Sequence, residues 1–116
     1  MDGKRLGKYG EYLAQDYLRR QGYEILHTNF RRPYGEIDII ARHNGYLVFV
    51  EVKTRSSLQY GRPSESVNRK KRRTYINLAQ DFMYNYGFDN CQVRFDVIEI
   101  IISDGEKQYN LITNAF

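Results

Sequence analysis

GEIDIIARHNGYLVFVEVKTR, residues 35–55, predicts two adjacent strands joined by a tight turn. The runs on either side of His43-Asn44-Gly45 are rich in Ile, Val, Phe and Leu, and an Asn-Gly pair between such runs favours a hairpin. Nearly all positions between the charged residues are aliphatic, which indicates that at least one face of the hairpin is covered. We therefore expect this hairpin at the centre of the fold.

Charged side chains recur at alternate positions on both strands of the hairpin. Because successive side chains of a strand point to opposite faces, each alternate set should share one face. The predicted sets are Glu36, Asp38 and Ile40 on the first strand, and Glu51, Lys53 and Arg55 on the second. Three carboxylates and a lysine can thus meet on one surface, where apolar neighbours make unpaired charges costly.

Helical periodicity predicts a first helix over residues 4–21, ended by Gly22. Gly7 and Gly10 fall on the apolar arc of this helix and should let it approach a sheet closely. Glu11 falls at the edge of the same arc, so we expect its carboxylate to be half-buried beside the sheet.

A second helix is predicted over residues 63–86, after a polar loop at residues 56–62, with Gly87 at its end. Lys71 falls in the middle of the apolar arc of this helix, so its amine must reach a carboxylate or an opening of the fold. Four other basic residues point away from that arc: Arg69, Lys70, Arg72 and Arg73. This basic run suits a nucleic-acid-binding patch or, equally, a solvated helix face.

Three more strands are predicted, at residues 23–30, 92–102 and 107–113. The second of these runs is the most continuously apolar and predicts a central strand buried on both faces. A strand, a crossover helix and another strand imply a parallel pair. The order therefore predicts an α/β fold with a mixed five-stranded sheet flanked by helices, in one domain over residues 1–116.

Composition limits the classes of protein that fit this chain of 116 residues. The single cysteine, Cys91, excludes an internal disulfide framework and a cysteine-rich zinc site. No apolar run approaches the ~20 residues that a membrane span needs, and the first residues lack the apolar core of a signal peptide. We therefore expect a cytoplasmic protein without a membrane partner. A formal net charge of +4 favours polyanion partners without identifying one.

An acid on one strand, followed on the next by acid-x-lysine, suits phosphodiester hydrolysis. Asp38 and Glu51 on adjacent strands can hold a hard divalent cation through oxygen, and Lys53 can orient an attacking water or neutralise a phosphate. Alternatively, the same residues form cross-strand ion pairs on a solvated sheet face. The core-side positions of Glu11 and Lys71 favour the first interpretation.

Motifs spread over most of the chain carry a resemblance to a known family. They are Gly10-Glu11-x-x-Ala14, Gly22-Tyr23, Asn29-Phe30-Arg31, GEIDIIA at 35–41, VFVEVKTR at 48–55, Gly61, Val67, Lys71, Ala79 and Arg94-Phe95-Asp96. With these motifs the sequence resembles the YraN-like family of small uncharacterised proteins. That family is similar to the restriction-endonuclease-like superfamily, and in particular to archaeal Holliday-junction resolvases.

The resemblance implies a restriction-endonuclease-like fold and a set of roles. Asp38, Glu51 and Lys53 match the active-site triad of the resolvases, and Glu11 matches the acid on their first helix. Ile37 stands where the named motif of the superfamily has a proline, which leaves the neighbouring acid in place.

We therefore predict a DNA endonuclease that uses Mg²⁺ or Mn²⁺, with branched or structured DNA as the implied substrate. The alternative is a non-catalytic nucleic-acid-binding or adaptor protein that keeps the fold. The predicted metal ligands are Asp38, Glu51, Glu11 and the backbone carbonyl of Val52, with Glu36 and Lys71 in support. The predicted nucleic-acid-binding residues are Arg55, Arg69, Lys70, Arg72 and Arg73. Because two-fold substrates suit a dimer, we also expect a homodimer.

Overall fold

The computed structural model describes residues 2–56 and 69–116. Within these ranges the helices and strands follow the predicted order, which confirms the α/β fold. The elements are α1 (Gly3–Arg20), β1 (Glu24–Arg32), β2 (Gly35–His43), β3 (Tyr46–Arg55), α2 (Arg69–Tyr86), β4 (Gln92–Ser103) and β5 (Glu106–Ile112). The predicted start of the second helix at Pro63, and most of the loop before it, lie outside the described residues.

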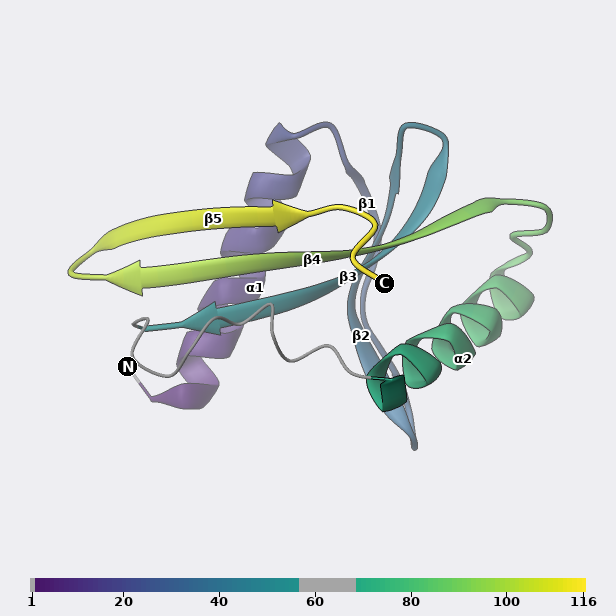
Figure 1. Ribbon diagram of the computed structural model, residues 1–116, viewed down its shortest axis with the longest axis horizontal. Coiled ribbons are helices and arrows are strands. Elements are labelled where there is room, and N and C mark those ends of the chain that lie inside the picture. Colours follow the sequence, from purple (N-terminus) through teal and green to yellow (C-terminus); the bar gives the residue numbers. More distant parts are fainter. Residues whose placement is uncertain (1, 57–68) are drawn as a thin grey trace.

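The strands form one mixed sheet in the order β1-β2-β3-β4-β5 (Figure 1). Neighbouring strands are antiparallel except β3 and β4, which run parallel and are separated in the chain by α2. Residues 96–100 of β4 are all buried, as expected for an inner strand. The predicted mixed sheet with one parallel pair is confirmed.

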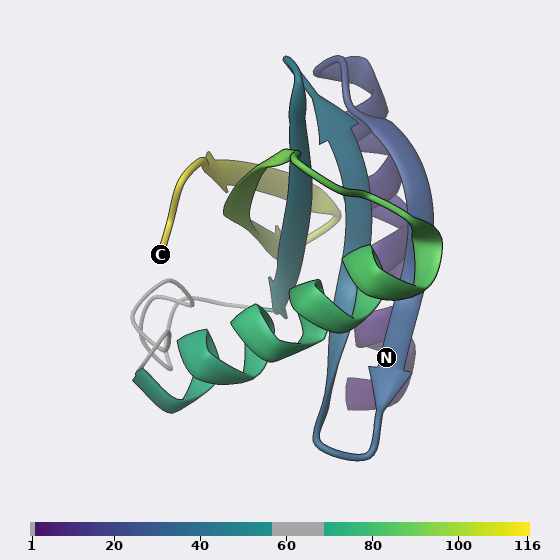
Figure 2. The same ribbon diagram turned by 90° about the vertical axis from the view of Figure 1, so that its right-hand side faces the viewer.

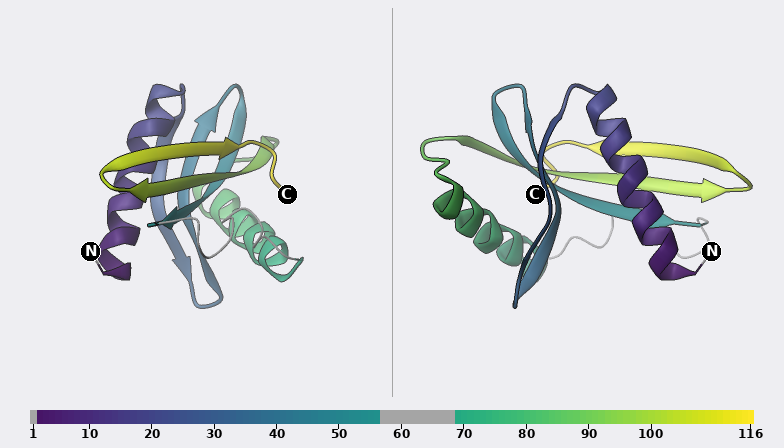
Figure 3. Two further views of the ribbon diagram at one scale, coloured as in Figure 1. Left: turned by 60° about the vertical axis from the view of Figure 1, so that its left-hand side comes forward. Right: turned by 180° about the vertical axis from the view of Figure 1, so that it is seen from behind.

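The two helices cover opposite faces of this sheet. α1 packs Leu13 and Leu18 onto one face, the α1 face. α2 packs Leu78 and Phe82 onto the other, the α2 face, where Phe49 of β3 is fully buried. Figure 2 shows α2 in front of the strands and α1 behind them, and Figure 3 shows the same arrangement from two further sides. Neither helix of the described chain is long and apolar enough to cross a membrane.

Tight turns join the antiparallel strands. Asn44 and Gly45 connect β2 to β3 with φ angles of 51° and 82°, the left-handed values that a type I′ hairpin turn requires. Asp104 and Gly105 connect β4 to β5 in the same way, with φ angles of 50° and 79°. The predicted central hairpin is therefore confirmed. β1 differs slightly from the prediction, because it continues in register with β2 as far as Arg32.

The alternation of side chains breaks in β2 at Asp38. Ile37 and Ile40 both pack on the α2 face, whereas Ile39 packs on the α1 face. In an unbroken strand Ile37 and Ile39 would share a face. The prediction that Glu36, Asp38 and Ile40 share one face is therefore wrong for Ile40, because the strand changes its facing between Ile37 and Ile39.

The same region is where β2 and β3 separate. Their ladder of paired residues runs from the hairpin turn only to Ile39 and Val50, although both strands continue beyond it. Figure 1 shows the two strands diverging from that point. We call the diverging segments, residues 35–38 and 51–55, the fork. Polar groups inside the fork lack the strand partner that a continuous sheet would provide.

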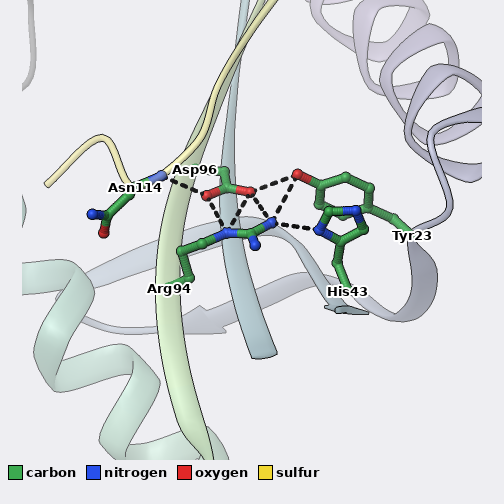
Figure 4. A network of polar contacts seen from close by, with 5 residues as sticks. All are labelled: Tyr23, His43, Arg94, Asp96 and Asn114. Carbon is green, nitrogen blue, oxygen red and sulfur yellow. Dashed lines mark hydrogen bonds and ion pairs between the residues drawn. The ribbon is translucent and has the colours of Figure 1, made fainter. Parts of the chain in front are cut away.

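A buried polar network ties three distant segments together near the hairpin turn (Figure 4). Asp96 of β4 is fully buried and accepts hydrogen bonds from Arg94, from the Tyr23 hydroxyl at 2.7 Å and from the Asn114 backbone N–H at 3.0 Å. Arg94 Nη2 also lies 2.8 Å from His43 Nδ1. The network fixes the end of α1, the hairpin turn and the C-terminal segment against β4.

Candidate active site

The fork brings together charged side chains from four elements. Asp38 comes from β2, Glu51 and Lys53 from β3, Glu11 from the middle of α1 and Lys71 from the first turn of α2. They form two groups: an acid cluster of Glu11, Glu36 and Asp38, and an ion-pair group of Glu51, Lys53 and Lys71.

Asp38 occupies the point at which the two strands of the fork part. Its Oδ2 accepts a hydrogen bond from the backbone N–H of Val52 at 2.8 Å. That N–H belongs to the part of β3 that has separated from β2, so the carboxylate replaces the strand partner that is missing there. The divergence of the strands thus fixes Asp38 against the backbone of β3.

The acid cluster places three carboxylates close together. One oxygen from each of Glu11, Glu36 and Asp38 lies within 4.8 Å of the others, and all three side chains are partly buried. The Asn29 amide, with its nitrogen turned toward the acids, donates to Glu11 Oε1 at 2.8 Å and to Glu36 Oε1 at 3.0 Å. Arg31 pairs with the outer oxygen of Glu36. The cluster therefore has a fixed geometry before any ligand binds.

This crowding changes how the acids titrate. The pKa of Asp38 is raised to about 7, chiefly by burial and also by the charges of Glu11, Glu51 and Glu36, against the opposing effect of the Val52 hydrogen bond. Burial and the charge of Glu36 also raise the pKa of Glu11. Holding all of these groups ionised costs free energy that a bound cation would recover.

The ion-pair group is centred on Glu51 of β3. Glu51 is only 5% exposed, and its Oε1 pairs with Lys71 and with Lys53, whose Nζ is 3.8 Å away. Its Oε2 is buried and has no hydrogen-bond partner in the described structure. Burial lowers the pKa of Lys53, an effect that Glu51 opposes and Lys71 reinforces. The prediction that Lys71 reaches the acids is confirmed. The alternative interpretation, in which Glu51 lies on a solvated sheet face, is wrong because Glu51 is buried.

Cavities reach the acid cluster from both helices. One of about 210 Å³ lies beside the first turns of α1 and is lined by Glu11, Asp38 and Val52 among others. Another of about 310 Å³ lies beside the start of α2 and is lined by Glu36 and Lys71 among others. The acids are therefore accessible to a small ion or a phosphate group.

Gly10 of α1 is what allows the helix to approach this site closely. A Cβ atom added to Gly10 would lie 1.9 Å from Thr54 Oγ1 of β3, so only glycine fits at this contact. Gly7 differs from the prediction, because a Cβ atom added there would meet nothing within 4 Å. The close contact at Gly10 brings its neighbour Glu11 to the acid cluster.

The predicted nucleic-acid-binding residues lie around the acid cluster and are not part of it. Arg69, Lys70, Arg72 and Arg73 are exposed at the start of α2, and Arg55 is partly buried at the end of β3. Lys70 alone among these five lines the cavity that contains Glu36. The basic run therefore lies at the rim of the site rather than in the acid cluster.

Sequence analysis missed two residues of the site. Asn29, with a left-handed φ of 54°, bridges Glu11 and Glu36, and asparagine is among the few residues that accept this backbone conformation. Glu99 of β4 lies opposite Lys53 in the parallel ladder, is 2% exposed and accepts from Asn110 Nδ2 at 3.2 Å. An acid within a run of aliphatic residues was the only signal for Glu99.

The donor set fits a hard divalent cation. Three carboxylates lie within 4.8 Å of one another, and a further buried carboxylate oxygen, Glu51 Oε2, has no partner in the described residues. Mg²⁺ and Mn²⁺ prefer such oxygen ligands. The structure groups Glu36 with Glu11 and Asp38, whereas Glu51 Oε1 is paired with Lys53 and Lys71.

The fold and the site together define a class of protein: a small α/β domain with a buried acid and lysine centre at a fork of its sheet. The uncharacterised protein family UPF0102, which is the YraN family, matches residues 10–100 of the chain. UPF0102 proteins of Caldicellulosiruptor bescii and Clostridioides difficile are 52% and 44% identical to it, each over the full length of both chains. One from Alkaliphilus oremlandii is 47% identical over 97% of this chain and 98% of its own. The chain therefore belongs to family UPF0102, which confirms the resemblance drawn from its motifs.

Proposed function

We propose that this protein is a metal-dependent endonuclease that hydrolyses phosphodiester bonds of DNA at the fork. The observation that carries the proposal is the environment of Asp38, which is partly buried near Glu11, Glu36 and Glu51, with Lys53 on the neighbouring strand. Three carboxylates lie within 4.8 Å of one another there, and such like charges cost free energy unless a cation compensates them. Such a centre is suited to a cation and a phosphate.

The acid cluster would hold Mg²⁺ or Mn²⁺. Glu11, Glu36 and Asp38 supply the carboxylates, and Glu51 Oε2 and the Val52 carbonyl are the further oxygens that we propose as ligands. When bound, such an ion supplies Lewis acidity toward a phosphoryl oxygen.

Lys53 is the residue that we propose to act on the reacting water and the phosphate. Hydrolysis joins the water oxygen to phosphorus, breaks one P–O ester bond and transfers a proton from the water to the departing oxygen. The Lys53 side chain is 13% exposed, so its amine acts where bulk water competes little. It can orient the water or stabilise charge on the phosphoryl oxygens, while Glu51 holds the amine in position.

DNA is the proposed substrate because basic side chains flank the site. Arg69, Lys70, Arg72 and Arg73 form an exposed positive surface beside the cavity of Glu36, and the chain carries a net charge of +4. Such a surface binds phosphates and makes affinity fall with salt. Branched substrates often have two-fold symmetry, so we propose a homodimer, which sedimentation velocity would detect as twice the 13.8 kDa chain mass.

Cutting assays with matched variants test the proposal. Labelled four-way junction, flap, single-stranded and duplex DNA are incubated with the wild-type protein, with and without Mn²⁺. We expect metal-dependent products that Glu51→Gln and Lys53→Ala abolish while retaining most of their DNA affinity, because phosphate contacts lie elsewhere. Products that persist undiminished in Glu51→Gln would indicate a contaminant or a different site.

A non-catalytic nucleic-acid-binding or adaptor protein is the second candidate. The observation that favours it is that Lys53 and Lys71 already neutralise Glu51, as in a purely structural centre. This candidate predicts that wild type binds the same DNA panel without any metal-dependent product. It also predicts that Lys53→Ala changes the stability of the protein without changing how the protein binds DNA.

A further inference from the structure

A third cavity, of about 550 Å³, lies between α2 and the tip of the β1–β2 hairpin. The metal and water chemistry proposed above does not use it. It is lined by Tyr34, Lys70, Arg73, Thr74, Asn77, Gln80 and Asp81. It shares Lys70 and Thr74 with the cavity that contains Glu36, so the two cavities are neighbours along α2. We call this cavity the Tyr34 groove.

Tyr34 is an exposed aromatic side chain in a fixed position. It lies in the turn between β1 and β2, and Figure 2 shows this hairpin passing alongside α2. Its hydroxyl donates to Asp81 of α2, which Arg32 also approaches at 3.8 Å. Nevertheless 48% of Tyr34 is exposed. A tethered ring with an accessible face can stack on a ligand while losing little conformational freedom.

The backbone beside Tyr34 is fixed as well. Gly35 lies so close to α2 that an added Cβ atom would be 2.6 Å from Thr74 Cγ2 and 3.3 Å from Leu78 Cδ1. The hairpin tip therefore rests on the helix that carries the basic residues of the groove. This contact sets the distance between the Tyr34 ring and the cations of α2.

The charge of the Tyr34 groove is positive. Lys70 and Arg73 are both exposed along it. Of the described residues that line the groove, Asp81 alone is acidic, and the Tyr34 hydroxyl and Arg32 engage its carboxylate. The groove thus offers two exposed cations beside one aromatic face, the combination that proteins use for phosphate and base together.

We propose that the Tyr34 groove binds an unpaired nucleotide of DNA next to the phosphate that is cut. The base stacks on Tyr34, and Lys70 and Arg73 contact the flanking phosphates. A cavity of about 550 Å³ has the size of a small-molecule pocket, which can hold one or two nucleotides. Since bases inside a duplex are already stacked on their neighbours, the groove selects flaps, loops or junctions with an unpaired base. This inference rests on the proposed function and narrows its substrate.

Binding measured without metal tests the groove separately from the chemistry. Fluorescence anisotropy is recorded in EDTA at fixed salt, with a labelled oligothymidine of about ten nucleotides and with a hairpin duplex of similar charge. We expect Tyr34→Ala to weaken binding of the single strand about tenfold, and Tyr34→Phe, which keeps the ring, to stay within about twofold of wild type. Both variants should change duplex binding little.

Two further variants complete the comparison. Tyr84→Ala removes a tyrosine that is 88% exposed on α2 but lies outside the groove lining, and it should bind both probes like wild type. Arg73→Gln should weaken both probes, since a phosphate contact does not distinguish paired from unpaired strands. Circular dichroism melts verify that all variants are folded.

The outcomes separate the groove from the nuclease proposal. Three results would each overturn the stacking role. Tyr34→Ala could lose as much affinity for the duplex as for the single strand, or it could lose no affinity. Tyr84→Ala could also lose as much affinity as Tyr34→Ala does. Selective loss in Tyr34→Ala without metal-dependent cutting by wild type would support the groove and count against the endonuclease. Cutting that needs Glu51 but is insensitive to Tyr34→Ala on flaps would leave the endonuclease and overturn the groove.

Discussion

Asp38 shows how burial turns one side chain into a pH-sensitive group. Its pKa is raised from 3.8 to about 7, first by burial and then by the charges of neighbouring acids. The native state therefore binds more protons than the unfolded state in this range, so stability falls as the pH rises from 3.8 to about 7. We expect Asp38→Asn to raise the free energy of unfolding at pH 8 by on the order of 2 kcal/mol and to change it little below pH 4.

Urea unfolding of wild type and Asp38→Asn across this pH range measures the effect. A matched substitution, Asp16→Asn, alters an exposed acid of α1 and serves as the control. The assignment to Asp38 would be contradicted if the free energy of unfolding depended on pH in the same way in wild type and in Asp38→Asn.

Metal binding should oppose this loss of stability. Because Mg²⁺ or Mn²⁺ would bind the native acid cluster and not the unfolded chain, it should raise the melting temperature. We expect a larger increase at pH 8 than at pH 5, since protons compete for Asp38 at the lower pH. Asp38→Asn should abolish the effect. The proposed metal site would be refuted if calorimetry detected no binding of metal to the wild-type protein at millimolar concentration.

Lys71 is held at the site by its pairing with Glu51. Replacing it in Lys71→Met keeps the apolar stem but leaves a carboxylate that is 5% exposed with one cation fewer. Because Lys71 itself is partly solvated, we expect a loss of only about 1–2 kcal/mol in the free energy of unfolding. Lys70→Met, which removes an exposed neighbour, should change it by less than about 0.5 kcal/mol. Equal effects of the two variants in urea unfolding would show that the pair contributes nothing.

At the scale of the elements, the contact between α1 and β3 sets the position of Glu11. Gly10→Ala places a methyl group 1.9 Å from Thr54 Oγ1 and 2.8 Å from Thr54 Cβ, so the helix or the strand must move. We expect a loss of about 1–3 kcal/mol, as for other overpacked cores. Gly7→Ala is the matched control, because it adds the same methyl group to open space and should stabilise the helix by about 0.5–1 kcal/mol.

Thermal denaturation measures the melting temperatures of these two glycine variants. If the contact is as described, the melting temperature falls in Gly10→Ala and rises in Gly7→Ala. The same displacement should reduce metal affinity in Gly10→Ala more than in Gly7→Ala, since Glu11 follows Gly10 directly. Two shifts of the same sign would indicate that α1 can slide over β3 without cost.

At the scale of the whole molecule, the network around Asp96 joins the end of α1, the hairpin turn and the C-terminal segment to β4. His43 lies beside Arg94, and burial, reinforced by the Arg94 charge, lowers the pKa of its imidazole below 6.5. Protonation would cost His43 its acceptor nitrogen and bring two cations together. The native state thus binds fewer protons than the unfolded state, so this contribution is complete above pH 6.5 and is lost as the pH falls through the lowered pKa.

The variant His43→Gln isolates this contribution from the opposing effect of Asp38. We expect the stability difference between wild type and His43→Gln to be largest above pH 6.5 and to shrink toward pH 5. Urea unfolding at several pH values provides the comparison. A difference that does not vary with pH would mean that His43 acts only through packing on Tyr23, whose ring centre is 4.0 Å away.

Local patterns in the sequence were sufficient for the elements, their order and much of the site. The hairpin turn at Asn44-Gly45, the apolar arcs of the helices and the place of Lys71 on one of them depend on neighbours within a few residues, and such signals can be read from the chain. Only the tertiary structure decided the rest. The change of facing at Asp38 occurs where β2 parts from β3. The bridge from Asn29 and the bond of Tyr23 to Asp96 join groups from different elements, and the bond spans 73 residues. Periodicity carries no information about such contacts, because they depend on how the strands twist and part once the core has packed.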